Sequence, residues 1–370
     1  PASIVPAGGF IRFTEATHFG TNGLAGTNGF ALSELGETLY LSVASNGHVV
    51  VYIDQEQFDA AASTVTFGRH IKSTGRKDFV AQSQATPNAA NAYPKIGPIV
   101  ISEVMYHPAD TNSCEFVELY NPGPSTVPLY DPANTQNLWQ LDGAVSYTFP
   151  SGTIMLPDTY VLVSATNEAG LRAVYTNIPL ATVFLGPWTG RLDNAGEALR
   201  LLRPTNPEPD GTVPYVLVER ISYSDDAPWP ATANGSGPAL ERRLTSLYAN
   251  DGFNWIAGFP GGSPGRAQPR VVVGSLAVTF EGILATVDVA PDIVWSNGAV
   301  TQVELLVGTN VVATEPLRWN GAAPGNTYAL SLRVTDGDGT HFSPPVSFVW
   351  PRVNAGPDRV IKLGTTLALT

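Results

Sequence analysis

The sequence has little cysteine, little charge and no long apolar run. Its single cysteine, Cys114, excludes an intrachain disulfide and a thiolate metal cluster. Because no basic residue stands beside it to lower its pKa, we expect Cys114 to pack as a small apolar side chain. Charged residues make up only 14% of the chain. No run of about 18 apolar residues occurs, so the sequence predicts no membrane span.

The charges that are present are mostly acidic, with 32 Asp and Glu against 20 Lys and Arg. The formal net charge of −12 argues against a nucleic-acid partner, because a phosphate backbone is bound by a basic surface. The chain starts at Pro1 without a charged segment followed by an apolar one. We therefore expect any signal peptide to lie outside it.

Motifs for catalysis are also missing. The five histidines are scattered, and no Gly-x-Ser-x-Gly elbow or phosphate-binding Gly-x-x-x-x-Gly-Lys loop occurs. The segment Asn234–Pro238, NGSGP, lacks the first glycine of such an elbow. A nucleophile would need a histidine and a carboxylate beside it. The sequence therefore predicts no enzyme activity and no cofactor.

Glycine and proline, by contrast, are abundant, with 36 and 31 residues. This composition is typical of many short strands joined by turns. Hydrophobic residues form 43% of the chain, which suffices for packed cores. A length of 370 residues indicates roughly two to four domains.

One stretch organises the chain. Ile99–Val104 and Glu115–Tyr120 each alternate apolar and polar residues, and the polar segment Tyr106–Ser113 joins them. Alternation with period 2 predicts two half-buried strands, here antiparallel. The residues ISEVMYHP followed by EFVELYNP resemble the opening of the bacterial lamin tail domain. The motifs APWP at 227–230, GSGPALER at 235–242 and GSPG at 262–265 extend this resemblance over residues 98–268. It implies an immunoglobulin-like β-sandwich without enzyme activity.

An internal repeat precedes this unit. Three later segments match earlier ones in the same order: Thr153–Val163 with Ile4–Phe13, Asn194–Leu201 with Glu34–Leu41, and Asp251–Trp255 followed by Ser263–Gly265 with Lys77–Phe79 followed by Thr86–Asn88. The first copy has no counterpart of the Ile99–Pro122 strand pair. We therefore interpret residues 1–92 as the C-terminal part of a lamin tail-like unit, followed by a linker at 93–97. A sheet without these strands should not stand alone, and its exposed face should carry Phe10, Phe13, Leu39, Leu41 and Val51.

The C-terminal third has a different character. Short strands at residues 270–350 are spaced as in a small sandwich. The segments Val303–Val307 and Val334–Gly339 resemble bacterial immunoglobulin-like repeats, and residues 351–370 resemble the start of a PKD-type domain. The expected fold class is all-β, with tandem immunoglobulin-like β-sandwiches joined by short Pro/Gly-rich linkers. Two short helices are also expected, one at Glu168–Tyr175 capped by Asn167 and one at Asp54–Ala62.

Ligand-type residues gather around the organising strand pair: Glu103, His107, Asp110, Glu115 and Glu118. Carboxylates and imidazole are ordinary metal ligands. The alternation, however, favours Glu103 and Glu118 on the solvent face of their strands. We expect no metal site here, with a metal site as the alternative.

Two further segments allow two interpretations each. Asp336 and Asp338, in the sequence DGDG, suggest a calcium loop, but the rest of that motif is absent. A plain Asp-Gly hairpin turn is the favoured interpretation. Asn234–Ser236 fits the N-glycosylation pattern, and it also fits a glycine-rich turn.

Three tryptophans stand next to proline or asparagine in expected loops: Trp188, Trp229 and Trp295. Loop aromatics can bind carbohydrate or protein. The alternative, which we favour, is that they pack over the ends of the sandwich.

These features predict a non-catalytic stalk, spacer or adhesion segment of a large secreted or cell-surface bacterial protein. Its expected partners are other domains of the same chain, neighbouring copies or cell-surface polysaccharide. A second hypothesis is a carbohydrate- or protein-binding accessory region of a secreted hydrolase whose catalytic domain lies outside these residues.

Overall fold

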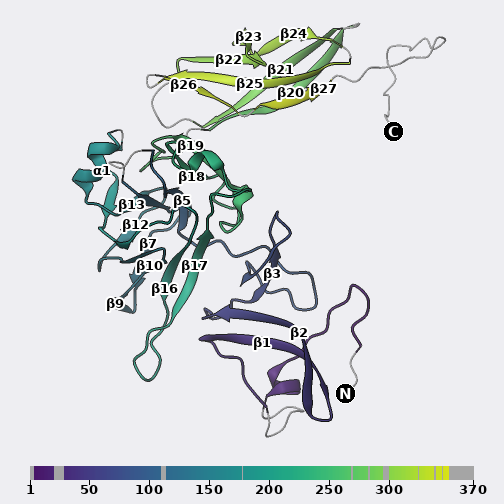
Figure 1. Ribbon diagram of the computed structural model, residues 1–370, viewed down its shortest axis with the longest axis vertical. Coiled ribbons are helices and arrows are strands. Elements are labelled where there is room, and N and C mark those ends of the chain that lie inside the picture. Colours follow the sequence, from purple (N-terminus) through teal and green to yellow (C-terminus); the bar gives the residue numbers. More distant parts are fainter. Residues whose placement is uncertain are drawn as a thin grey trace, which may run out of the picture. The chain divides into compact units, whose positions relative to one another are not determined.

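The computed structural model describes residues 4–20, 29–109, 114–176, 178–267, 270–281, 284–294, 300–323, 325–336, 339–343 and 345–349. The chain divides into two compact units, Pro1–Arg266 and Ala267–Thr370. Both are built from sheets whose strands pair mainly antiparallel, as the sequence predicts, with Val161–Val163 and Val183–Leu185 as a parallel pair, and Figure 1 shows their strands. The segment that resembles a PKD-type domain, residues 351–370, lies outside the described residues.

The first compact unit begins with two separate hairpins. The longer joins β1 (Gly36–Ser45) to β2 (His48–Asp59), and the shorter joins β3 (Phe67–Ile71) to β4 (Lys77–Ala81). A single π-helical turn, Glu15–Phe19, precedes them. The helix expected at Asp54–Ala62 is wrong, because β2 runs on through Asp59. Cross-strand pairing with β1 holds these residues extended, and a nine-residue helix has little intrinsic stability to oppose it.

The complete sandwich follows from residue 99 onward. Its first sheet has the order β14-β13-β6-β5-β18-β19, and its second has the order β15-β11-β10-β16-β17. The first sheet consists of β5 (Val100–Met105), β6 (Phe116–Tyr120), β13 (Tyr160–Ser164), β14 (Val183–Leu185), β18 (Pro238–Arg242) and β19 (Trp255–Pro260). The second consists of β10 (Gln140–Gly143), β11 (Val145–Thr148), β15 (Thr189–Gly190), β16 (Ala198–Pro204) and β17 (Tyr215–Ser222).

The organising strand pair lies in the middle of the first sheet. As predicted, β5 and β6 are antiparallel neighbours, and both bury apolar side chains in the core between the sheets, including Ile101, Val104, Val117 and Leu119. Short strands complete this unit: β7 (Val127–Pro128), β8 (Tyr130–Asp131), β9 (Asn134–Leu138) and β12 (Ile154–Met155). The expected helix forms as α1 (Glu168–Val174), where the Asn167 side chain accepts a hydrogen bond from the Gly170 backbone at 3.0 Å.

The second compact unit is a smaller sandwich. One sheet has the order β20-β21-β24, and the other has β23-β22-β25-β26 with β27 also paired to β25. Their bounds are β20 (Arg270–Glu281), β21 (Leu284–Val294), β22 (Gln302–Val307), β23 (Asn310–Thr314), β24 (Arg318–Ala322), β25 (Thr327–Asp336), β26 (Gly339–Phe342) and β27 (Val346–Val349). Val287, Leu305 and Leu332 lie in the core between these sheets.

The β1–β2 hairpin repeats the β16–β17 hairpin of the complete sandwich. Leu39 pairs with Glu56 as Leu199 pairs with Ile221. Each hairpin then has a bulge at the matching place, after Leu41 in one and after Leu201 in the other. Because a bulge is a specific feature of a sheet, the shared register supports the repeat predicted from the sequence.

The β3–β4 hairpin likewise repeats β18–β19. Arg69 pairs with Phe79 as Arg242 pairs with Trp255. Two steps along each ladder, Phe67 pairs with Ala81 as Leu240 pairs with Ala257. The registers of both N-terminal hairpins therefore match those of two hairpins of the complete unit.

The two copies differ in what covers them. Leu201 is completely buried in the sandwich core, whereas its counterpart Leu41 is 63% exposed. Phe10, Phe13 and Val51 are also exposed, as predicted, and Leu39 is half-buried. The first copy thus presents to solvent a face that the complete unit buries.

Candidate functional site

A buried ion pair joins the two sheets of the complete sandwich. Arg242 Nη1 of β18 lies 2.8 and 2.9 Å from the two carboxylate oxygens of Glu219 on β17. The two side chains are 1% and 5% exposed. Burial raises the pKa of Glu219, and the charge and hydrogen bonds of Arg242 oppose that rise. A pair this deeply buried depends on both partners, since either charge alone would be strongly destabilising.

This ion pair also holds the backbone of strand β5. The Ile101 N–H donates to Glu219, and the Ile101 carbonyl accepts from Arg242 Nη1 at 3.3 Å. Backbone pairing between β18 and β5 covers Val104 and Glu103. The side-chain pair therefore extends the ladder beyond its last backbone contact, and we name it the strand clamp.

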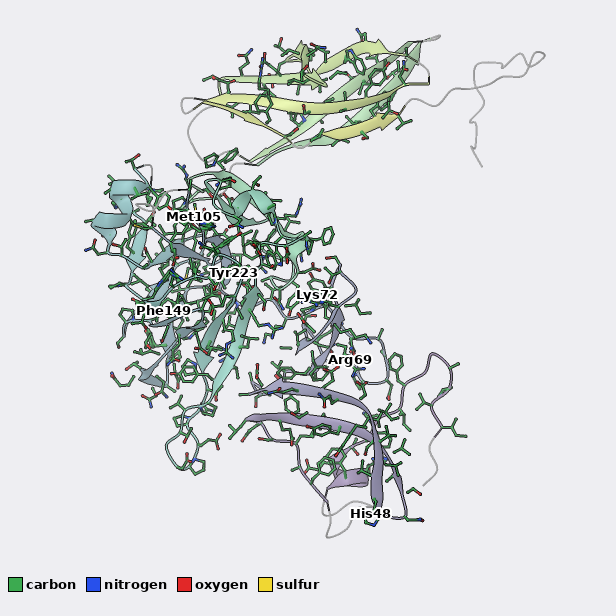
Figure 2. All side chains as sticks on the ribbon, in the orientation of Figure 1. His48, Arg69, Lys72, Met105, Phe149 and Tyr223 are labelled. Carbon is green, nitrogen blue, oxygen red and sulfur yellow. The ribbon has the colours of Figure 1, made fainter. Side chains whose placement is uncertain are left out.

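The first copy has the same clamp at equivalent positions. Arg69 corresponds to Arg242, and Asp54 corresponds to Glu219, in two independently aligned hairpins. Arg69 Nη2 lies 2.5 Å from Asp54 Oδ2, and Arg69 Nε also donates to Glu56. These hydrogen bonds hold the pKa of Asp54 below its usual value and raise that of Arg69. Arg69 is labelled in Figure 2. Among the described residues, no strand pairs with β3 on the side away from β4.

A second buried cluster is a row of three glutamates across neighbouring strands. Glu103 of β5 pairs with Glu118 of β6 on one side and with Glu241 of β18 on the other. All three are buried. The solvent-face prediction for Glu103 and Glu118 is therefore wrong, because residues 262–266 cover that face of the sheet.

Backbone and hydroxyl groups from this covering segment hydrogen-bond to all three glutamates, although Glu241 Oε1 is buried without a hydrogen-bond partner. The Ser263 N–H donates to Glu103 at 3.0 Å, and the Gly265 N–H donates to Glu118 at 2.6 Å. The Ser263 hydroxyl lies 3.4 Å from Glu241 Oε2. A side chain at Gly262 would collide with the Glu103 carboxyl, and its φ of +70° also favours glycine. The row therefore anchors the segment that closes the sandwich.

Burial controls the protonation of the row. It raises the pKa of Glu103 to about 8, against opposing hydrogen bonds from Ser263. Burial and then the charge of Glu103 raise the pKa of both Glu118 and Glu241. The charge of Arg266 opposes the rise at all three. Facing carboxylates at this depth keep protons at neutral pH, since desolvation and like charge both disfavour ionisation.

The other predicted ligand-type residues have partners of their own. His107 Nδ1 hydrogen-bonds with the Asn234 side-chain oxygen, and Glu115 accepts from the Leu192 N–H at 3.0 Å. Asp110 lies outside the described residues. Within the described part of the chain, no three His, Cys, Asp or Glu residues are grouped to hold a metal ion. Glu241 was not predicted to belong to this cluster. The sequence next to Leu240 indicates only that it lies in a strand, and not that this strand pairs with the one that carries Glu103.

The candidate binding-loop tryptophans do not form an exposed group. Trp188 and Trp229 are both buried in the main core, where the Trp229 and Trp255 rings lie 6.2 Å apart. Their burial agrees with the favoured interpretation that these two rings pack in the sandwich. Trp295 lies outside the described residues.

The calcium alternative stays a prediction. Asp336 pairs with Gly339 where β25 meets β26, which leaves two residues for the turn. Asp338 and the Asp336 side chain lie outside the described part of the structure. A two-residue connection between paired strands agrees with the hairpin interpretation.

A polar network fastens the first copy to the complete sandwich. Asp78 of β4 accepts from the Tyr248 hydroxyl at 2.9 Å and from Asn250 Nδ2 at 2.7 Å. Arg220 and Lys72 form ion pairs with the same carboxylate at 3.4 and 3.3 Å. Burial acts to raise the pKa of Asp78, but these partners outweigh it and the pKa is lowered. Asp78 therefore remains charged and couples the two repeats.

Two more contacts strengthen this junction. The Ser73 N–H donates to Asp251 at 2.7 Å, and the Tyr248 N–H donates to the Tyr93 hydroxyl at 2.8 Å. The His70 ring lies edge-on to both Tyr93 and Tyr248. Burial lowers the pKa of His70, although Asp251 and Asp78 oppose this change. Beside the junction lies a groove of about 1030 Å³, lined on one side by Phe58 of the first copy.

Comparison with protein families agrees with the architecture. The Lamin Tail Domain family model matches residues 93–219. This match covers β5 through β16 and most of β17, and the sandwich continues beyond it to β19. Comparison with curated proteins found no match for the chain. No helix in the described ranges is long and apolar enough to cross a membrane.

Proposed function

We propose that this chain is a non-catalytic structural segment, a stiff spacer, of a large secreted or cell-surface bacterial protein. The supporting observation is the junction at Asp78, where one carboxylate receives four polar partners from both repeats. A chain of sandwiches joined by flexible linkers would need no such network. Fastened repeats transmit position and force along the chain, which is what a stalk or assembly module requires.

The Lamin Tail Domain match supports this proposal, because it places a β-sandwich module at the centre of the chain. The partners of the spacer would be neighbouring domains of the parent protein or other copies of the chain. The spacer would hold those neighbouring domains at a fixed spacing. A polysaccharide partner would contact exposed loops rather than Trp188 and Trp229, whose rings are buried.

Spin labels at Ser45→Cys and Ala169→Cys, in a Cys114→Ser background, test the stiffness of the junction. Pulsed electron–electron double resonance on the full chain should give one narrow distribution of the distance between the two labels. Asp78→Ala should broaden it, because the junction loses its shared acceptor. Asp288→Ala, which removes an ion pair in the second compact unit, should leave it unchanged. A distribution that is already broad in the parent protein would refute a stiff spacer.

The groove beside the junction favours a second candidate, a carbohydrate- or protein-binding accessory module. Its lining combines Tyr40, Arg200 and Glu56 with apolar side chains, and such mixed linings can hold extended ligands. Glycan-array binding that Tyr40→Ala and Arg200→Ala both abolish would favour this candidate over the spacer.

A further inference from the structure

The outer edge of β3 presents backbone groups with which no other described strand pairs. The Thr66 carbonyl accepts from the Gln82 N–H at 2.8 Å. Inward and outward pairs alternate along an antiparallel ladder, and β3–β4 runs without a bulge. The backbone groups of Phe67 and Arg69 therefore point away from β4. In the complete unit the matching residues, Leu240 and Arg242, face β5.

The strand clamp beside this edge is already assembled. Arg242 and Glu219 bind the N–H and carbonyl of Ile101 in the complete unit. In the first copy, Arg69 and Asp54 are paired in the same way, but their side chains are 34% and 44% exposed. Glu56 stands where the complete unit has Ile221, and it gives Arg69 Nε a partner.

We propose that the β3 edge and the Arg69–Asp54 clamp form an acceptor site for a partner segment. This segment is an antiparallel strand pair whose strands alternate apolar and polar residues as Ile99–Met105 and Glu115–Tyr120 do. Its first strand pairs with β3, and its backbone N–H and carbonyl bind Asp54 and Arg69. Addition of a strand to an open edge is a common mode of peptide recognition.

The apolar surface beside the edge fits this occupant. Leu41 and Val51 are exposed, whereas Leu201, the counterpart of Leu41, is covered by the sheet that contains β5 and β6. The Asn91 side chain occupies part of this edge, because its Nδ2 donates a hydrogen bond to the Arg69 carbonyl at 3.1 Å. The incoming strand must displace Asn91, so removal of this side chain should help binding.

The probe is a fluorescent synthetic peptide of residues 97–122 with Cys114→Ser, titrated into the full chain and followed by fluorescence polarisation. We expect saturable binding. Arg69→Ala and Asp54→Asn should each weaken it about tenfold, the effect of losing a hydrogen bond to a charged group. Asn91→Ala should strengthen it, and Arg318→Ala, which removes an exposed arginine of the second compact unit, should change nothing.

Hydrogen exchange locates the bound peptide. Its addition should protect the amides of Phe67 and Arg69 and leave Gly68 and His70, which already face β4, as they were. A peptide of the same composition without apolar alternation should neither bind nor protect.

Absence of saturable binding, or binding that Arg69→Ala leaves intact, would overturn the proposal. So would a concentration-dependent dimer of the full chain that Arg69→Ala dissociates, since the occupant would then be a second copy. None of these results depends on whether the junction at Asp78 is stiff.

Discussion

Arg242 and Glu219 form an ion pair between the two sheets of the complete sandwich, with Nη1 and Oε1 2.8 Å apart. This pair supplies the two hydrogen bonds of Ile101 that lie beyond the last backbone pairing of β5 with β18. The clamp thus ties β5 to β18 in its own sheet and to β17 in the opposite sheet.

Removal of one clamp partner should be costly in the complete unit. Arg242→Ala leaves the Glu219 charge buried without its cation, and we expect a loss of about 3–5 kcal/mol in the free energy of unfolding. Arg69→Ala removes the equivalent residue, whose side chain is only partly buried, and serves as the matched control with a smaller effect on stability. Urea titration of the full chain measures both. Equal effects of the two substitutions would contradict the different burial of the two clamps.

The repeat offers a second matched pair in the apolar face. Leu201→Ala creates a cavity in a closed core, and we expect a loss of about 2–5 kcal/mol. Leu41→Ala changes an exposed position, so its effect should stay within about 0.5 kcal/mol. The same urea titration compares the two. A comparable loss at Leu41 would mean that its side chain is covered in solution.

The glutamate row predicts a specific pH dependence. A carboxyl whose pKa is higher in the folded state binds more protons there than in the unfolded chain. The stability that this gives is present below the unfolded value of 4.5 and is lost as the pH rises through about 8 for Glu103. His70 has the opposite sign, because its pKa is lowered, but it contributes only near the usual histidine pKa of 6.5 and below.

The melting temperature should therefore fall between pH 5 and pH 9. Glu241→Gln keeps the shape of the side chain and removes one titrating group, so it should flatten this slope. Glu168→Gln, on the exposed first turn of α1, is the control and should keep the slope of the parent protein. Differential scanning fluorimetry across this range makes the comparison. A melting temperature that rises steadily to pH 9 would show that the row is ionised in the folded state.

Much of the fold could be predicted from local pattern. Period-2 alternation located β5 and β6, and the Asn167 cap located α1, because both signals depend on near neighbours in the sequence. The helix predicted at Asp54–Ala62 is wrong because the polar residues of this segment alternate only weakly, and pairing with β1 holds its first part, Asp54–Asp59, extended.

The site could not be predicted in the same way. Alternation shows that Glu103 and Glu118 share a face with each other, but it does not show that residues 262–266, far along the chain, cover that face. Arg242 and Glu219 likewise meet only through the packing of two sheets. Trp188 and Trp229 have loop-like neighbours in the sequence, while their burial follows from the closure of the core.

The turn between β25 and β26 gives a prediction about metal removal. Backbone pairing of Asp336 with Gly339 closes this hairpin, so it needs no ion to hold it. Addition of a chelator should leave the melting temperature of the full chain unchanged. A decrease that calcium restores, and that Asp336→Asn and Asp338→Asn abolish, would establish a calcium site, since a bound ligand stabilises the folded state.

The most direct test of the central claim, that the first copy and the complete sandwich form one block, is scanning calorimetry of the full chain. We predict two unfolding transitions, one for residues 1–266 and one for the second compact unit. Asp78→Ala should split the first transition, because it removes the acceptor shared by Tyr248 and Asn250. A separate transition for residues 1–92 in the parent protein, unchanged by Asp78→Ala, would contradict the account.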